Sequence, residues 1–501
     1  MVAGGILLSR LIGLVRVRVF SHYFGLRSDA ADAFYAAFRI PNFLQNLFGE
    51  GVLSASFIPV YARLLAEGDE EEAGRVAGAI GAILALTVSV LCALGALATP
   101  WLIVLIAPGF HGAKRDLTVS LVRILFPGAG LLALSAWCLG VLNSHRKLFL
   151  SYASPVMWNI AMIGALLVFG GTPDLSSLAT MLAWGSVLGS LLQFGVQFPV
   201  VILLVRRIRF RIDLQSAHVR EVIRNFGPVF ISRGVVQISA YIDALIASLL
   251  PTGAVTGLTN AQLIYLLPVS LFGMSVSAAE LPVMSSAVGT AEEIAASIRA
   301  RIDSGMRHIA FFIVPSAAAF LAFGDLIAGI LLVSGRFTHE DAVYVWGILA
   351  GSSIGLLAST MGRLYSSAYY ALRDTRTPLK FAVLRVAVTT VLGYVCAKPL
   401  PIWIGIEPRW GVAGLTASAG VAGWIEFALL RRGLSRKLGP MPSAGAFIAK
   451  LWAAAAVAVI VGTAARFAPL PNFVILGLFG TVYLTLAPES RQLLKKLIGR
   501  R

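Results

Sequence analysis

Charged residues are scarce in this chain of 501 residues. Asp, Glu, Lys and Arg make up 13% of it, whereas about 25% is usual for a soluble globular protein. Hydrophobic residues reach 58%, and the mean hydropathy is +0.84. The composition excludes an ordinary soluble domain and predicts a protein that crosses a membrane many times.

Cysteine is also scarce, and motifs of enzymatic chemistry are missing. Cys92, Cys138 and Cys396 lie in separate apolar segments without a CxxC spacing, which disfavours a disulfide framework or a zinc site. The six histidines have no metal-ligand spacing, and neither a Walker A loop nor a GxSxG motif occurs. We therefore expect no enzyme, no cofactor and no ATP-driven step.

Apolar stretches long enough to span a bilayer recur along the whole chain. We expect about fourteen transmembrane helices, at residues 3–24, 32–65, 77–107, 117–143, 148–170, 177–205, 222–250, 256–288, 305–334, 341–371, 379–397, 410–430, 446–467 and 471–488. The first stretch lacks a signal-peptide cleavage pattern, so we expect it to be retained. The predicted fold class is an all-α polytopic membrane protein.

Lysine and arginine are distributed unevenly among the predicted loops, which indicates orientation. The poorer side holds only Arg27, Lys114, Arg115, Arg336, Lys398, Arg409 and Arg466. Both termini are therefore expected in the cytoplasm. The net charge of +17 follows from this asymmetry and from attraction to anionic lipids, which disfavours a nucleic-acid partner.

Two halves of the chain are similar in sequence. The Ser-Arg pair at Arg10 recurs at Arg233, about 223 residues later, and Phe-Gly pairs precede both Glu50 and Glu280. Chance similarity between alanine-rich helices is the alternative. Six spans per half predict a parallel repeat with a site between the halves. We expect an N-terminal lobe at 1–212, a C-terminal lobe at 213–435, and two extra helices with a basic tail at 436–501.

The first span carries two arginines, Arg10 and Arg16. A guanidinium at bilayer depth costs at least ~2.5 to 3.5 kcal/mol, so such a residue usually faces a polar cavity. No acid in the same span neutralises the pair, and we expect an anion site. Arg18 points to another face and is expected to reach the interface.

The second span carries Asp32, Arg39 and Glu50. Asp32 and Arg39 are seven residues apart and so share one helix face. Pro41 and the glycines beside Glu50 predict a bend at this acid, as in a gate. We assign cavity or gating roles to Asp32, Arg39, Glu50 and Glu280; internal salt bridges that fix helix packing are the alternative.

Three segments in the first sixty residues are distinctive: SRLIGLVR at 9–16, ADAFYAAFRIPN at 31–42 and LFGEGVLSASFIPV at 47–60. They resemble the MurJ (MviN) lipid II flippase family, and a weaker match continues through 266–282 and 373–378. The resemblance implies the MOP superfamily fold, with two six-helix lobes and two extra helices that form a groove for a lipid tail.

The implied cargo is lipid II, the undecaprenyl-pyrophosphate-linked peptidoglycan precursor. It would move from the inner to the outer leaflet of a bacterial cytoplasmic membrane by alternating access. The resemblance assigns Arg10 and Arg16 to the anionic headgroup and makes Asp32 and Glu50 functionally important. The implied partners are lipid II, membrane lipids, and cell-wall synthesis and division proteins, and a monomer is expected.

The chain departs from the family pattern at Gln45 and Leu263, where many members have arginine. Arg233, the repeat partner of Arg10, is expected to compensate as a third headgroup ligand. Asp243 is a candidate sodium ligand, as in some relatives. However, the eleventh span has neither Asp nor Asn, which disfavours a sodium site.

The sequence is also compatible with two other functions. One is a cation-coupled multidrug exporter, or an exporter of another lipid-linked oligosaccharide, from the same superfamily. The surplus of arginine over acid disfavours cationic substrates. The other is a membrane scaffold for cell-wall enzymes, which would leave the desolvation cost of Arg10 and Arg16 unexplained.

Overall fold

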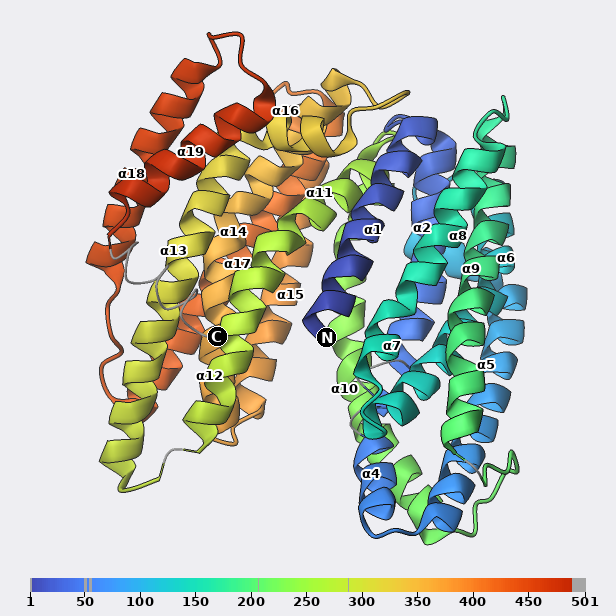
Figure 1. Ribbon diagram of the computed structural model, residues 1–501. Helices are drawn as coiled ribbons and strands as arrows, with labels where there is room; N and C mark the ends of the chain where they lie inside the picture. The colour runs from blue at the N-terminus through green and yellow to red at the C-terminus, as the bar shows by residue number, and fades with distance from the viewer. Residues whose placement is uncertain (1, 49–51, 54–55, 206, 287, 489–501) are drawn as a thin grey trace. The chain divides into compact units, whose positions relative to one another are not determined.

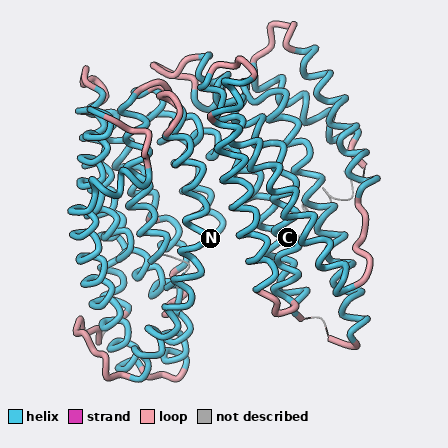
Figure 2. The backbone as a smooth tube through the Cα atoms, turned by 180° about the vertical axis from the view of Figure 1, so that it is seen from behind, coloured by secondary structure: helices cyan, strands magenta, loops and turns pink. Residues whose placement is uncertain are grey.

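The computed structural model describes residues 2–48, 52–53, 56–205, 207–286 and 288–488, without the side chains of 2–7, 40–41, 44–46, 228–229 and 231–240. Within these residues every regular element is a helix, and the loops lie at helix ends (Figures 1 and 2). This confirms the predicted all-helical class. The chain forms two compact units, Met1–Thr256 with Ser334–Phe337, and Gly257–Val333 with Thr338–Arg501.

Ten helical segments of the described chain are long and apolar enough to cross a membrane, and they coincide with ten of the predicted spans. The helices at the other four predicted positions are α1 (Val2–Phe24), α2 (Asp29–Phe48), α10 (Ala217–Ser248) and α19 (Asn472–Leu486). The first three carry charged residues within the span, and α19 has 15 residues. The protein is therefore a multi-pass membrane protein.

The first unit also contains α4 (Ile58–Ala66), α5 (Glu70–Ile106), α6 (Gly112–Ser144), α7 (Leu148–Ala153), α8 (Pro155–Phe169) and α9 (Leu175–Leu204). Helix α6 packs against α2, α5 and α9. Its Trp137 is buried and donates Nε1–H to the Ala77 carbonyl oxygen at 3.2 Å, which satisfies the indole inside an apolar core. Cys138 is a buried free thiol in the same core.

Helix α10 packs against α2, α4 and α5 in this unit. The Phe48 ring lies 5.9 Å from that of Phe226 and 5.4 Å from that of Phe230. The seventh span is thus in the same compact unit as the first six, although the sequence places a lobe boundary at residue 212. The lobe boundary at residue 212 stays a prediction.

The connection between α9 and α10 is held against the start of α5 by an ion pair and a hydrogen bond. Asp213 forms an ion pair with Arg75, and Ser216 donates its hydroxyl to Glu72 Oε1 at 2.7 Å. The Arg75 guanidinium holds the pKa of the Asp213 carboxyl below its ordinary value. Loop residues far from α5 in sequence are therefore held against its first turns.

The second unit contains α11 (Ala254–Pro268, from Gly257 onward), the π-helix η1 (Val269–Met274), α12 (Ser275–Ser285), α13 (Ala291–Leu332), α14 (His339–Ala371), α15 (Arg376–Ala397), α16 (Pro399–Trp403), the 3-10 turn η2 (Pro408–Trp410), α17 (Gly411–Leu438), α18 (Gly445–Ala465) and α19. Helix α14 packs against α13 and α17. A Cβ on Gly355 would lie only 2.4 Å from Gly420 Cα, so α14 and α17 cross in backbone contact.

Candidate functional site

Asp32 lies in the first turn of α2 and is only 1% exposed. Its Oδ1 accepts hydrogen bonds from the Thr256 backbone N–H at 2.9 Å and hydroxyl at 2.6 Å. Its Oδ2 accepts from the Gly253 N–H and from Lys114 Nζ, both at 2.9 Å. The carboxylate therefore caps α11, whose first N–H groups lack partners in the helix and whose dipole favours an anion there.

The start of α6 extends this cluster through Lys114. Its Nζ lies 3.1 Å from Asp29 Oδ1, which also accepts the Thr252 hydroxyl hydrogen bond at 2.7 Å. We call Asp29, Asp32, Lys114, Thr252 and Thr256 the Asp32 junction. It joins α2, α6 and the loop between α10 and α11, all within the first compact unit.

Arg39 lies about two turns after Asp32 on the same face of α2. The Tyr241 hydroxyl of α10 donates to the Arg39 carbonyl oxygen at 2.9 Å. The acids whose charges act on the Arg39 side chain are Asp243 and Asp32. The charge of Asp243 on α10 thus acts on Arg39 of α2.

Among the described residues, no group of three or more His, Cys, Asp or Glu side chains is placed to hold a metal ion. The use of Asp243 as a sodium ligand stays a prediction.

Arg16 of α1 is packed against α8. Its guanidinium carbon lies 4.9 Å from the centroid of the Trp158 ring, and Nη1–H donates to Met162 Sδ at 3.9 Å. Trp158 is itself anchored, since its Nε1–H donates to Ser186 Oγ at 3.2 Å. The Arg16 Nε atom is buried and has no hydrogen-bond partner within the described residues. The side chain is thus oriented by its contacts with Trp158 and Met162.

Arg10 lies on another side of α1. Six residues separate it from Arg16, which corresponds to directions roughly 120° apart around the helix axis. The Arg10 residue is exposed, whereas Arg16 is partly buried. The assignment of both arginines to one headgroup site stays a prediction.

The other predicted site residues are described only in part. Glu280 on α12 is partly buried, and its Oε2 has no hydrogen-bond partner among the described residues. Glu50, with the bend expected there, lies outside the described residues. Arg233 belongs to α10, but its side chain, like that of Gln45, also lies outside them. Their proposed roles stay predictions.

Sequence reasoning did not identify Trp158, Thr256 or Lys114 as parts of this site. Lys114 was noticed only as a charge in an outer loop, and it lies 82 residues from Asp32. Trp158 fits an apolar span as well as it fits a cation-binding surface. No local spacing in the sequence signals either contact, because each joins helices that meet only in the folded protein.

Several known proteins are similar to this chain in sequence. A family model described as lipid II flippase MurJ matches residues 20–480. A protein of Burkholderia cenocepacia named lipid II flippase MurJ is 32% identical over 453 residues, covering 89% of this chain and 84% of that protein.

Two solved structures have the same fold. A lipid II flippase MurJ in an inward closed conformation matches with a TM-score of 0.78 at 23% identity, covering 100% of this chain and 99% of that one. An inward-facing multidrug resistance transporter of the MATE family and MOP superfamily matches with a TM-score of 0.68 at 19% identity, covering 86% of this chain and 95% of that one. The fold is therefore that of the MOP superfamily.

Proposed function

We propose a transport mechanism from the premise that this chain belongs to the lipid II flippase MurJ family. The match of the family model to residues 20–480 carries this assignment. The protein is accordingly a lipid II flippase, and the family acts in the bacterial inner membrane.

The proposed cycle is alternating access. The headgroup enters from the cytoplasmic leaflet while the polyprenyl tail stays in lipid, and the headgroup is then released outside. A pyrophosphate needs fixed cations, and arginine offers planar, bidentate donors. Arg16, oriented by Trp158 and with its Nε unpartnered in the described chain, is the proposed central ligand. Arg10 and Arg233 are proposed to supply further donors.

The Asp32 junction is proposed to be a latch on the outer side. The lysine and arginine distribution predicts that the starts of α2 and α6 face outside, as does the loop before α11. Removing one partner of a buried, hydrogen-bonded charge is strongly unfavourable. The latch should therefore open as a unit when the headgroup is released, with Arg39, Glu50 and Glu280 in cavity or gating roles.

Orientation is inferred from the lysine and arginine distribution, and the partners are inferred from the family. Both termini are proposed to lie in the cytoplasm, and the protein is proposed to act as a monomer beside cell-wall synthesis and division proteins. A cation-coupled exporter is the second candidate, favoured by the shared MOP fold alone. A positively charged substrate would be repelled by Arg16, so lipid II fits better.

Flipping of lipid II in proteoliposomes tests the mechanism. Arg16→Ala should lower the rate at which lipid II becomes accessible in the opposite leaflet by at least tenfold. Arg16→Lys should recover part of this rate, because lysine restores the charge but not the planar guanidinium group. Arg18→Ala, on the same helix, is the matched control and should keep the wild-type rate. A wild-type rate for Arg16→Ala would remove Arg16 from the site.

A growth assay separates a transporter from a scaffold. The double variant Arg10→Ala with Arg16→Ala should fail to support a strain that lacks its own flippase, at matched expression. A scaffold would tolerate this loss of charge within the membrane, so normal growth would favour the scaffold.

A further inference from the structure

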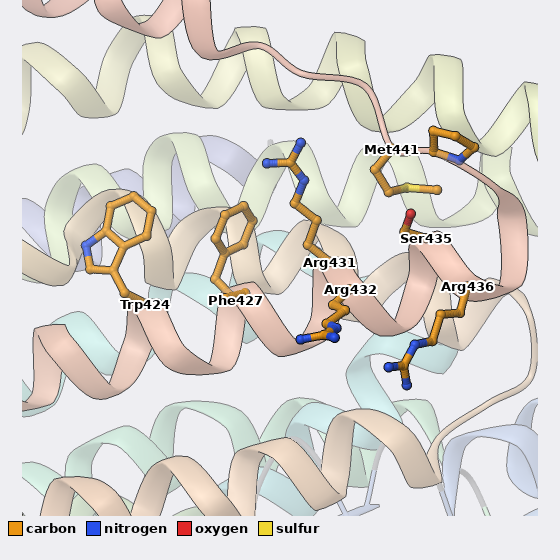
Figure 3. A pocket seen from close by; sticks show the side chains of 9 residues that line it. Trp424, Phe427, Arg431, Arg432, Ser435, Arg436 and Met441 are labelled. Atoms are coloured by element: carbon orange, nitrogen blue, oxygen red, sulfur yellow. The ribbon is translucent and has the colours of Figure 1, made fainter.

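An open pocket of about 680 Å³ lies at the C-terminal end of α17 (Figure 3). The α17 residues that line it include Trp424, Phe427, Arg431, Arg432, Ser435 and Arg436. These positions recur at spacings of three, four and one, so they cover a broad half of the helix surface. The aromatic residues come first along this surface, and the three arginines follow near the helix end.

The arginines of this pocket are not neutralised by protein groups. Within the described part of the chain, none of the three forms an ion pair. The acids that contact or belong to α17 already have partners: Asp374 pairs with Lys437, and Glu426 pairs with Arg385 at 3.2 Å. The pocket therefore concentrates positive charge that an external anion is able to neutralise.

The three guanidinium groups extend to two sides of α17. Figure 3 shows the Arg431 guanidinium on the side of Met441, and those of Arg432 and Arg436 on the opposite side. Arg431 also donates a long, 3.5 Å hydrogen bond to the Pro442 carbonyl oxygen. All three arginines are nevertheless among the residues that line the pocket.

A second, mostly apolar pocket of about 250 Å³ continues from the first. The two share Trp424, Phe427 and Arg431. The smaller one reaches between α13, α14 and α18, where Met306 and Leu357 are among its lining residues. A charged mouth thus leads into an apolar interior, which matches a ligand with an anionic head and a hydrocarbon tail.

The expected depth of the pocket in the membrane indicates where that ligand would come from. The predicted twelfth span ends at residue 430, directly before Arg431, on the side that the lysine and arginine distribution assigns to the cytoplasm. Phosphate groups of inner-leaflet lipids lie at this level, and basic pockets between transmembrane helices on this side bind anionic headgroups. Tryptophan residues are typical of the same interface.

We propose that this pocket binds an anionic phospholipid of the inner leaflet, with its phosphodiester among Arg431, Arg432 and Arg436 and part of an acyl chain in the apolar pocket. The ligand is a resident membrane lipid rather than the transported cargo, so the inference goes beyond the proposed function. The competing explanation is that the arginines only anchor α17 at the interface and complement its dipole.

Lipid titration of the purified full chain in phosphatidylcholine nanodiscs distinguishes these explanations. Dioleoyl phosphatidylglycerol is the probe, and its apparent affinity is read from the rise in unfolding temperature. The triple variant Arg431→Gln, Arg432→Gln and Arg436→Gln should bind this lipid at least tenfold more weakly than the wild type. Arg432→Gln alone should weaken binding about threefold, which keeps the test valid if the triple variant is unstable.

The matched control is Arg376→Gln, Lys380→Gln and Lys450→Gln, which removes the same charge from exposed residues outside the pocket. It should bind phosphatidylglycerol as the wild type does. Equal weakening in both triple variants, or none in the pocket variants, would overturn the proposal. So would inorganic phosphate binding as tightly as the lipid, because the site would then take a soluble anion. Lipid II is absent from this assay, so its failure leaves the flippase assignment unaffected.

Discussion

Asp32 and Thr256, which are 224 residues apart, are joined by two hydrogen bonds to one carboxylate oxygen. This pair holds the first turn of α11 against the first turn of α2. The other oxygen of Asp32 accepts from Gly253 and Lys114. Loss of the acid would leave the N-terminus of α11 without its acceptor and Lys114 with the exposed Asp29 as its remaining counter-ion.

Asp32→Ala is therefore expected to lower the free energy of unfolding by about 3 kcal/mol, the scale for breaking a buried ion pair from one side. The unfolding temperature of the purified protein measures this change, and lipid II flipping should fall with it. Asp29→Asn is the control, because Asp29 has a side-chain exposure of 62% and its ion pair should contribute under about 1 kcal/mol. Wild-type stability of Asp32→Ala would show that the junction is not a latch.

Trp158 is expected to matter for transport through Arg16. Trp158→Ala removes a cation–π contact of about 0.5 to 2 kcal/mol, so the flipping rate should fall severalfold, while Trp158→Phe should retain most of it. Trp184→Ala, at an exposed tryptophan of α9, is the control. If Trp158→Ala and Trp184→Ala flip lipid II equally well, the orientation of Arg16 does not depend on the ring.

Arg233 is predicted to compensate for the arginines missing at Gln45 and Leu263. Arg233→Ala should then lose lipid II transport, and Arg233→Ala combined with Leu263→Arg should recover part of it. Growth of a flippase-deficient strain at matched expression reports both results. If Arg233 instead pairs with Asp243, the double variant Arg233→Ala with Asp243→Ala will be tolerated and Leu263→Arg will rescue nothing.

Gly355, where α14 crosses α17, should not tolerate a larger side chain. A methyl group at Gly355 would collide with the Gly420 backbone, so Gly355→Ala should destabilise the protein by about 1 to 3 kcal/mol. The unfolding temperature measures this effect. Gly164→Ala in α8 is the control, because a Cβ there meets no atom within 4 Å. Equal unfolding temperatures for the two variants would contradict the close crossing.

The connection between α9 and α10 should loosen in acid. The folded pKa of Asp213 is below its ordinary value, so its contribution is complete above that ordinary value and is lost as the pH falls through the folded pKa. Asp213→Asn should therefore increase proteolysis of residues 207–216 at neutral pH. Pepsin should cut this connection in the wild type increasingly as the pH is lowered. Asp116→Asn, at another exposed acid, should behave as the wild type at neutral pH.

Some properties of this protein follow from the sequence alone. Hydropathy is additive along a helix, so the positions of the spans could be read without tertiary information. The cost of a guanidinium in lipid likewise marks Arg10 and Arg16 as functional candidates wherever the helices pack. The first sixty residues were also sufficient to indicate the family.

Tertiary structure decided which partner each charged residue has. Asp32 could have paired with any cation brought near it, and only the packing of α2, α6 and the loop before α11 selects Lys114 and Thr256. In the same way, α1 and α8 place Arg16 on Trp158. Hydrogen bonds and cation–π contacts act over a few ångströms between residues that are distant in sequence. Their partners are therefore set by helix packing and cannot be read from local spacing.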